Sequence, residues 1–215
     1  MTELVFILDR SGSMAGLERD TIGGFNSMLE KQRGEEGECV VSTVLFDHET
    51  TVIHDRVPIA QVPDLTERDY FVRGSTALLD AIGGAIHHIG NVHKYARKED
   101  VPERTLFVIT TDGFENASSK YTYKKVRHMV EHEKSKYGWE FIFLGANIDA
   151  AQEAGKFGID ASMSADYRCD GIGTALNFDV ISETIGRVRA CGSAPLTADW
   201  KKRIDEDFKN RGGNK

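Results

Sequence analysis

The sequence has few cysteines, no long apolar run and no excess of positive charge. Its three cysteines, Cys39, Cys169 and Cys191, are too few and too scattered for a disulfide framework, and an odd number fits a reducing compartment. No apolar stretch approaches the roughly 20 residues of a membrane span. No basic segment followed by an apolar one opens the chain, so no signal peptide is expected. These absences predict a cytoplasmic location without a membrane span.

The charge balance is acidic, with 27 Lys and Arg against 34 Asp and Glu and a formal net charge of −7. A general binder of phosphate backbones needs a basic face, so nucleic acid is not expected as a partner. The 215 residues suit one domain with a substantial core. We predict that this domain covers residues 1–192. Residues 193–215 are predicted to form an extension, with a short helix within 197–208 and then a disordered tail.

Apolar segments of strand character alternate along the chain with segments of helical period. The expected strands are 4–9, 39–47, 50–57, 104–112, 139–147 and 161–165, and the expected helices are 16–33, 77–98, 122–137, 149–156 and 174–190. The connection between 39–47 and 50–57 is too short for a crossover helix, so these strands should form an antiparallel hairpin. The pattern predicts a Rossmann-like α/β fold, with a doubly wound, mainly parallel sheet, one antiparallel edge strand and helices on both faces.

Three segments should carry oxygen ligands to one edge of this sheet. Asp9, Ser11 and Ser13 follow the first strand in "DRSGS", Thr76 opens a helix in "GSTALLDAI", and Asp112 ends a strand in "TTDG". Such sheets bind ligands beyond the carboxyl ends of their strands. Five oxygen donors without His or Cys favour Mg²⁺ over zinc, with Mn²⁺ or Ca²⁺ as alternatives. Because the hydroxyls are neutral, the cation stays electrophilic and would accept one more carboxylate from outside.

Together, the three motifs closely resemble the metal-ion-dependent adhesion site (MIDAS) of the von Willebrand factor A (vWA) domain. The resemblance to this domain covers roughly residues 2–190, and the chain looks like a bacterial-type intracellular member of the family. The resemblance implies that Ser11 and Ser13 coordinate the cation through their hydroxyls. Thr76, Asp9 and Asp112 would bind it directly or through water. It also implies a protein partner whose Asp or Glu completes the coordination. Intracellular relatives often work with AAA+ ATPases, and family members can move their last helix, here 174–190, when a ligand binds.

Neighbours of the motif residues are also expected to contribute to the site. The resemblance implies that Gly12 and Gly74 let the backbone turn close to the ion. Arg10, at a variable position of the motif, could steer an acidic ligand. Glu115 and Asn116 are expected near the edge of the site, where they could influence the choice of partner.

Two alternative interpretations of single motifs are less favoured. Asp9, Ser11 and Ser13 alone would suit a helix cap, but Thr76 and Asp112 favour a metal. The stretch "HMVEH" (128–132) matches the inverted zinc-peptidase motif H-x-x-E-H. The histidines at its two ends, however, fall opposite the predicted apolar face of the helix, which consists of Tyr123, Val126, Val130 and Tyr137.

The alternative function is that of a metal-dependent hydrolase, a phosphoesterase in which the same cation polarises a phosphoryl oxygen. Ser11 stands where a phosphatase of the haloacid-dehalogenase type has its general acid, and the three loops supply no other general acid or base. The sequence therefore predicts a cation-dependent protein-binding module that is not an enzyme.

Overall fold

The computed structural model describes residues 1–190 and 194–212. Six strands form one sheet in the order β3-β2-β1-β4-β5-β6. Their bounds are β1 (Thr2–Asp9), β2 (Cys39–Phe46), β3 (Thr50–Pro58), β4 (Arg104–Thr111), β5 (Glu140–Gly145) and β6 (Ser164–Asp166). β3 pairs antiparallel with β2, and every other pairing is parallel. This confirms the predicted mainly parallel sheet with one antiparallel edge strand.

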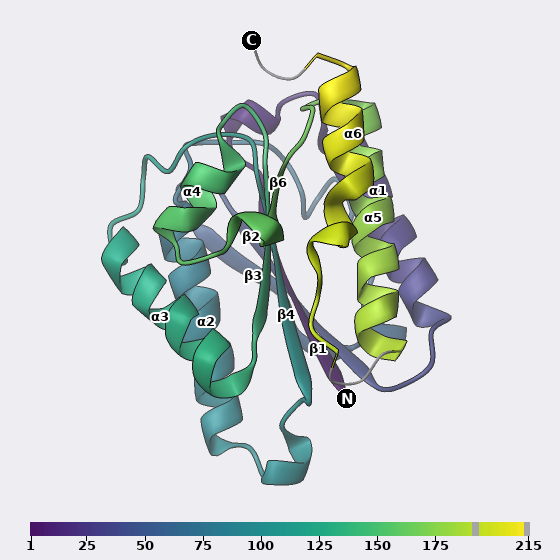
Figure 1. Cartoon of the computed structure of the whole chain (residues 1–215), viewed down its shortest axis with the longest axis vertical. Coiled ribbons are helices and arrows are strands. Elements are labelled where there is room, and N and C mark those ends of the chain that lie inside the picture. The colour runs from purple at the N-terminus through teal and green to yellow at the C-terminus, as the bar shows by residue number, and fades with distance from the viewer. Residues whose placement is uncertain (191–193, 213–215) are drawn as a thin grey trace.

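Helices cover both faces of the sheet, as Figure 1 shows with the sheet seen nearly edge-on. One face carries α1 (Glu18–Arg33), α5 (Gly171–Ala190) and α6 (Lys202–Asn210). The other carries α2 (Leu78–Tyr95), α3 (Tyr123–Tyr137) and α4 (Ala150–Lys156). None of the helices in the described ranges combines the length and apolar character needed to cross a membrane.

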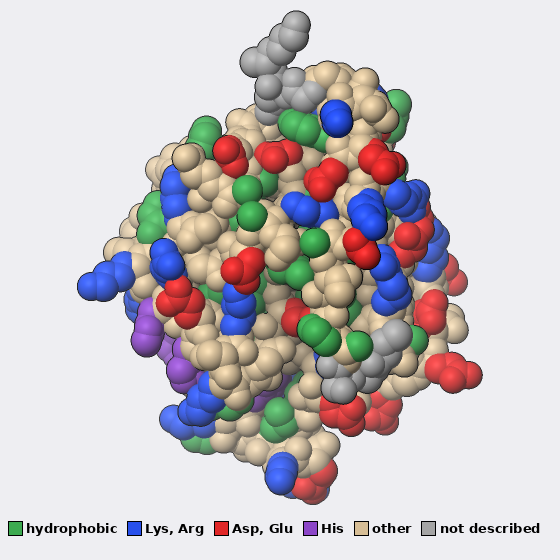
Figure 2. All heavy atoms as spheres, viewed as in Figure 1, with side chains coloured by type: hydrophobic (Ala, Val, Ile, Leu, Met, Phe, Trp, Pro, Cys, Tyr) green, Lys and Arg blue, Asp and Glu red, His purple; other side chains and the backbone are tan. Residues whose placement is uncertain are grey.

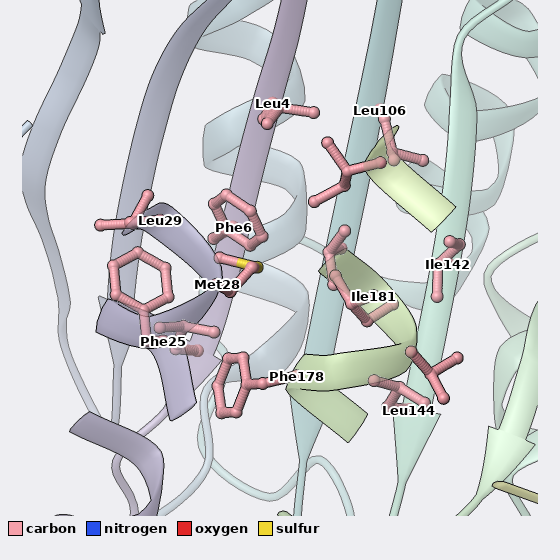
Figure 3. Packing of buried hydrophobic residues seen from close by; sticks show 14 of the residues in the cluster. Leu4, Phe6, Phe25, Met28, Leu29, Leu106, Ile142, Leu144, Phe178 and Ile181 are labelled. Atoms are coloured by element: carbon pink, nitrogen blue, oxygen red, sulfur yellow. The ribbon is translucent and has the colours of Figure 1, made fainter. Parts of the chain in front are cut away.

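The central strand β1 divides the core into two halves. Leu4, Phe6 and Leu8 pack toward α1 and α5, whereas Val5 and Ile7 pack toward α2. Because both faces of the sheet are covered, the strand is apolar at successive positions instead of alternating with polar ones. In the first half, the Phe6 and Phe25 rings meet edge to face with their centroids 5.3 Å apart, beside side chains of α5 (Figure 3).

The strand order places one crevice at the carboxyl ends of β1 and β4. From β1 the chain proceeds to β2 and β3 on one side, and it returns to β4 on the other side of β1. Such a reversal opens a crevice between the two adjacent strand ends, where ligands of open α/β sheets bind. Asp9 is the last residue of β1, and Asp112 directly follows β4. The fold therefore brings both predicted acids to this crevice.

The C-terminal segment packs on the same body as the rest of the chain. The predicted helix within 197–208 occurs as a 3₁₀ turn (Ala198–Lys201) followed by α6. Trp200 and Ile204 are buried in the core beside α5. Of the predicted disordered tail, Asn210 ends α6 and Arg211 Nη1 lies 2.7 Å from Asp170 Oδ2. Residues 213–215 lie outside the described residues, and the domain boundary at 192 stays a prediction.

The helix with the zinc-peptidase-like motif presents both histidines to solvent. Val126 and Val130 are buried on its apolar face, as predicted, while His128 and His132 are exposed. The prediction that Tyr137 belongs to this face is wrong, because the side chain is 55% exposed. The helix ends there, since Gly138 takes a left-handed conformation with φ 68°, and Trp139 fills the next core position instead.

Candidate metal centre

Three loops meet at the carboxyl ends of β1 and β4. The Gly12 N–H donates to the Gly74 carbonyl at 3.0 Å and joins the loop after β1 to the loop before α2. The Thr76 N–H donates to Asn116 Oδ1 at 2.8 Å, and the Asn116 N–H donates back to the Thr76 carbonyl at 3.0 Å. The loop before α2 is thereby joined to the loop after β4. These bonds bring together the three segments that carry the predicted ligands.

The first two loops approach each other closely at their glycines; that these let the backbone turn close to an ion stays a prediction. Gly74 has φ +68°, a conformation that L side chains rarely adopt. A Cβ on Gly12 would lie 3.3 Å from the Gly74 carbonyl oxygen. Both glycines therefore serve the backbone contact that brings Thr76 toward the serines.

Asp9 and the two serines form the first part of the site. The Ser11 N–H donates to Asp9 Oδ1 at 2.7 Å, and the Thr111 hydroxyl donates to Asp9 Oδ2 at 2.7 Å. The hydroxyl oxygens of Ser11 and Ser13 lie 3.1 Å apart. Asp9 and Ser11 are buried, whereas Ser13 is exposed. The site is therefore closed on the strand side and reaches the surface at Ser13.

Asp112 forms the opposite wall. Asn147 Nδ2 donates to its Oδ1, and Cys169 Sγ donates to its Oδ2 at 2.8 Å. The Asp112 N–H reaches Asp9 Oδ2 at 3.3 Å, so the two acids share one hydrogen-bond network. Neither Asn147 nor Cys169 was expected here from the sequence. They come from the ends of β5 and β6, and no local pattern marks them.

The electrostatics of the two acids fit a cation. Asp9 and Asp112 are 1% and 2% exposed. Burial raises the pKa of both carboxyls above the usual value, and the hydrogen bonds they accept offset this only in part. After burial, the largest effects on the two pKa values come from hydrogen-bond donors, and none of these donors is a Lys or Arg side chain. Two buried acids whose partners in the described part of the chain are uncharged donors, beside neutral hydroxyls, match the hard ligands and the charge that a divalent ion needs.

The prediction that Arg10 steers an acidic ligand is wrong. The side chain is buried, its Nε donates to Asp47 Oδ2 at 2.8 Å, and its Nη2 donates to Thr51 Oγ1 at 2.9 Å. The physical reason is that Asp47, at the end of β2, is itself fully buried and needs a positive partner. Arg10 is committed to that pair and has no access to an external ligand.

Glu115 and Asn116 brace the third loop. Glu115 accepts hydrogen bonds from the N–H groups of Leu79, Ala117 and Ser118 at 2.7–2.9 Å. Asn116 holds Thr76, as described above. Both residues thus fasten the loop after β4 to the start of α2.

A second acidic cluster lies nearby but does not suit a cation. Ligand atoms of Asp47, His48 and Glu49 all lie within 4.8 Å of one another. Asp47, however, also accepts from the Nε of Arg73 at 2.9 Å, and Arg73 Nη2 pairs with Glu49 at 3.0 Å. Burial acts to raise the pKa of Asp47, but the Glu49 N–H and the two guanidiniums outweigh it and lower that pKa. The Arg10 and Arg73 guanidiniums thus already neutralise the carboxylates that a cation would need as ligands.

Comparisons with known proteins support the fold. No protein-family model and no curated protein matches the sequence. Among solved structures, the vWF domain of the pilus tip protein Mfa5 from Porphyromonas gingivalis matches with a TM-score of 0.63 at 12% identity, over 90% of this chain and 97% of that one. A von Willebrand factor type A protein from Catenulispora acidiphila matches with a TM-score of 0.54 at 14% identity, over 84% and 41%.

A third solved structure has a metal in the corresponding kind of site. Proximal thread matrix protein 1 from the mussel byssus, with a zinc-occupied MIDAS motif, matches with a TM-score of 0.55 at 11% identity, over 86% of this chain and 46% of that one. This chain thus spans about half the length of the mussel protein. At these identities the likeness concerns the fold, and the fold is that of a vWA domain. The five predicted ligands stay a prediction.

Proposed function

We propose that this chain is a divalent-cation-dependent protein-binding module. Asp9, Ser11, Ser13, Thr76 and Asp112 would hold the cation, and an Asp or Glu of a partner protein would complete its coordination. The observation that carries the proposal is the pair of buried acids at the crevice. Burial raises the pKa of both, and the partners that the described residues offer them are backbone N–H, hydroxyl, amide and thiol groups. The bound cation would supply a positive charge that attracts an external carboxylate.

Mg²⁺ is the proposed ion because every predicted ligand is a hard oxygen. Mn²⁺ and Ca²⁺ are alternatives that the same donors accept. The mussel protein, which has zinc in its MIDAS motif, supports the idea that a vWA fold can hold a metal in such a site. The AAA+ ATPase partner and the cytoplasmic location stay predictions from the sequence.

The surroundings of the site favour binding of a protein over catalysis. Two large apolar side chains are exposed on the loops that also carry predicted ligands, Phe71 before α2 and Phe114 after β4. Phe71 also lines a hollow of about 680 Å³ beside the start of α1. Exposed aromatic side chains next to the site would give a partner protein an apolar contact beside the cation.

Titration calorimetry with Mg²⁺, Mn²⁺ and Ca²⁺ tests the cation site. We expect the wild-type chain to bind at least one of these ions, and Asp112→Ala to reduce that affinity by at least tenfold, because it removes one of only two charged ligands. Glu67→Gln is the control, since Glu67 is an exposed acid that pairs with Arg19 at 3.6 Å and lies outside the predicted ligand set. Equal affinity of wild type and Asp112→Ala, with both folded by circular dichroism, would refute the proposed site.

A further inference from the structure

A third acid at the same edge of the sheet joins the loops of the candidate metal centre. Asp47 directly follows β2 and is fully buried. Its Oδ2 accepts from the Nε atoms of Arg10 and Arg73, at 2.8 and 2.9 Å. Arg10 lies between Asp9 and Ser11, and Arg73 directly precedes Gly74. One carboxylate oxygen therefore holds an arginine from each of the two loops that carry hydroxyl ligands.

Backbone hydrogen bonds fasten the same junction. The Arg73 N–H donates to the Arg10 carbonyl at 2.9 Å, and the Ala77 N–H donates to the Asp47 carbonyl at 2.7 Å. Thr76 lies between these two anchored positions of the loop before α2. The Asp47 contacts thus limit how far Thr76 can move relative to the segment that follows β1.

We propose that Asp47 and Arg73 are positioning residues of the cation site: through Arg10 and Arg73, Asp47 fixes the spacing between Thr76 and the Ser11–Ser13 segment. This inference rests on the proposed function and adds to it the residues that set ligand geometry. Partners that orient metal ligands from outside the coordination sphere contribute roughly 10–100-fold to metal affinity. A loose Thr76 loop would lose that contribution, because the binding of an ion would then also have to order the loop.

Replacing Arg73 distinguishes a positioning role from a purely electrostatic effect on cation binding. Removing a positive charge near a cation site should strengthen cation binding if Coulomb interaction alone matters. Removing a residue that positions the ligands should weaken it. The two explanations predict opposite signs for Arg73→Gln, whereas Asp47→Asn would weaken binding under either one. Arg73 is therefore the informative position, and its side chain is 39% exposed, so its replacement should leave the fold intact.

The experiment compares three variants by calorimetric titration with Mg²⁺. We expect Arg73→Gln to bind roughly tenfold more weakly than wild type, and Arg73→Lys to be weakened too, since a lysine keeps the charge but lacks the guanidinium geometry. Glu49→Gln is the matched control. It removes the partner of Arg73 Nη2 at the surface while leaving the bond to Asp47, and we expect less than a twofold change. Unchanged or tighter binding by Arg73→Gln overturns the proposal, as does an equal loss in Glu49→Gln.

A metal-free readout keeps this inference separable from the proposed function. In EDTA, Arg73→Gln should speed hydrogen exchange at the Gly12 and Ala77 amides, which bond across the junction, and leave the amide of Val126 in α3 unchanged. If the wild-type chain binds none of the three cations, the proposed function fails, but exchange still decides whether Arg73 holds the loops together. Wild-type protection of Gly12 and Ala77 in Arg73→Gln would overturn the positioning role.

Discussion

Asp9 and Asp112 are carboxylates that the fold buries at a cost to its own stability. A carboxylate that loses water without gaining a positive partner favours the protonated form, which is why the pKa of each is raised by burial. Asp47, buried at the same edge, shows the opposite shift, because an N–H group and two guanidiniums stabilise its charge. The contrast distinguishes acids that need a cation from an acid that already has its partners.

This contrast predicts opposite effects of the same kind of substitution. In EDTA at neutral pH, Asp112→Asn should raise the free energy of unfolding, because it removes a buried charge whose pKa burial raises. Asp47→Asn should lower it by roughly 3 kcal/mol, since it leaves two arginines without their shared acid. Urea denaturation followed by circular dichroism measures both values. A loss of stability in Asp112→Asn comparable to that in Asp47→Asn would contradict this expectation and would mean that the bonds from Asn147 and Cys169 stabilise the Asp112 charge enough to offset its burial.

At the scale of the elements, the strands and the helices that cover them were predictable from the sequence. The side-chain contacts between these elements were not. The strands from 39 to 57 match the observed hairpin, because a short connection between two β-branched runs permits little else. The crevice acids Asp9 and Asp112 were predictable from a different signal, since each follows an apolar run whose carboxyl end lies at the ligand-binding edge of the sheet. Asp47 follows an apolar run as well, so the rule that found the other two acids could have found it.

The remaining contacts of the site depend on strand order. Arg10 meets Asp47 because β1 and β2 are parallel neighbours in a register that pairs Asp9 with Phe46. Cys169 reaches Asp112 only because β4, β5 and β6 lie in sequence across the sheet. Neither pairing leaves a periodic or local pattern in the sequence. The sequence therefore indicates which residues could bind a metal, and the topology determines which residues support them.

The last two helices form one packed unit on the face of the sheet that α1 also covers. Arg203 bridges α6 to α5, with its Nη2 2.8 Å from Asp179 Oδ2 and its Nη1 2.6 Å from Glu183 Oε1. Ile204 is 1% exposed and belongs to the core with α5. Being covered by both α1 and α6, α5 is buried around much of its circumference instead of along one stripe.

We expect Ile204→Ala to lower the free energy of unfolding by about 3 kcal/mol, because it leaves a cavity in this core. Glu206→Ala, on the exposed side of the same helix, should change it by less than about 0.5 kcal/mol. Urea denaturation provides the comparison. If Ile204→Ala has the same free energy of unfolding as the wild type, α6 contributes little to the stability of the core. That result would support the predicted domain boundary at residue 192.

On the scale of the whole molecule, the candidate site depends on global folding. Its five predicted ligands are spread from residue 9 to residue 112, and the segments that carry them come together only when β1 and β4 are paired. Charges of both signs are interspersed over the face of the molecule seen in Figure 2, so that face offers no single-sign region to concentrate cations unspecifically. Specific cation binding should therefore be a property of the native state alone.

This dependence predicts that Mg²⁺ stabilises the entire fold. A ligand that binds only the native state raises the free energy of unfolding by about 2.7 kcal/mol at one hundred times its dissociation constant. We expect this gain for the wild-type chain in urea denaturation with Mg²⁺, measured against EDTA at matched ionic strength. Asp112→Asn should gain at most about half as much, roughly 1.4 kcal/mol at the same Mg²⁺ concentration, since losing one of the two charges weakens the site by at least tenfold. An equal gain in Asp112→Asn would mean that Mg²⁺ acts elsewhere on the surface, because a general effect of the ion does not require the crevice between β1 and β4.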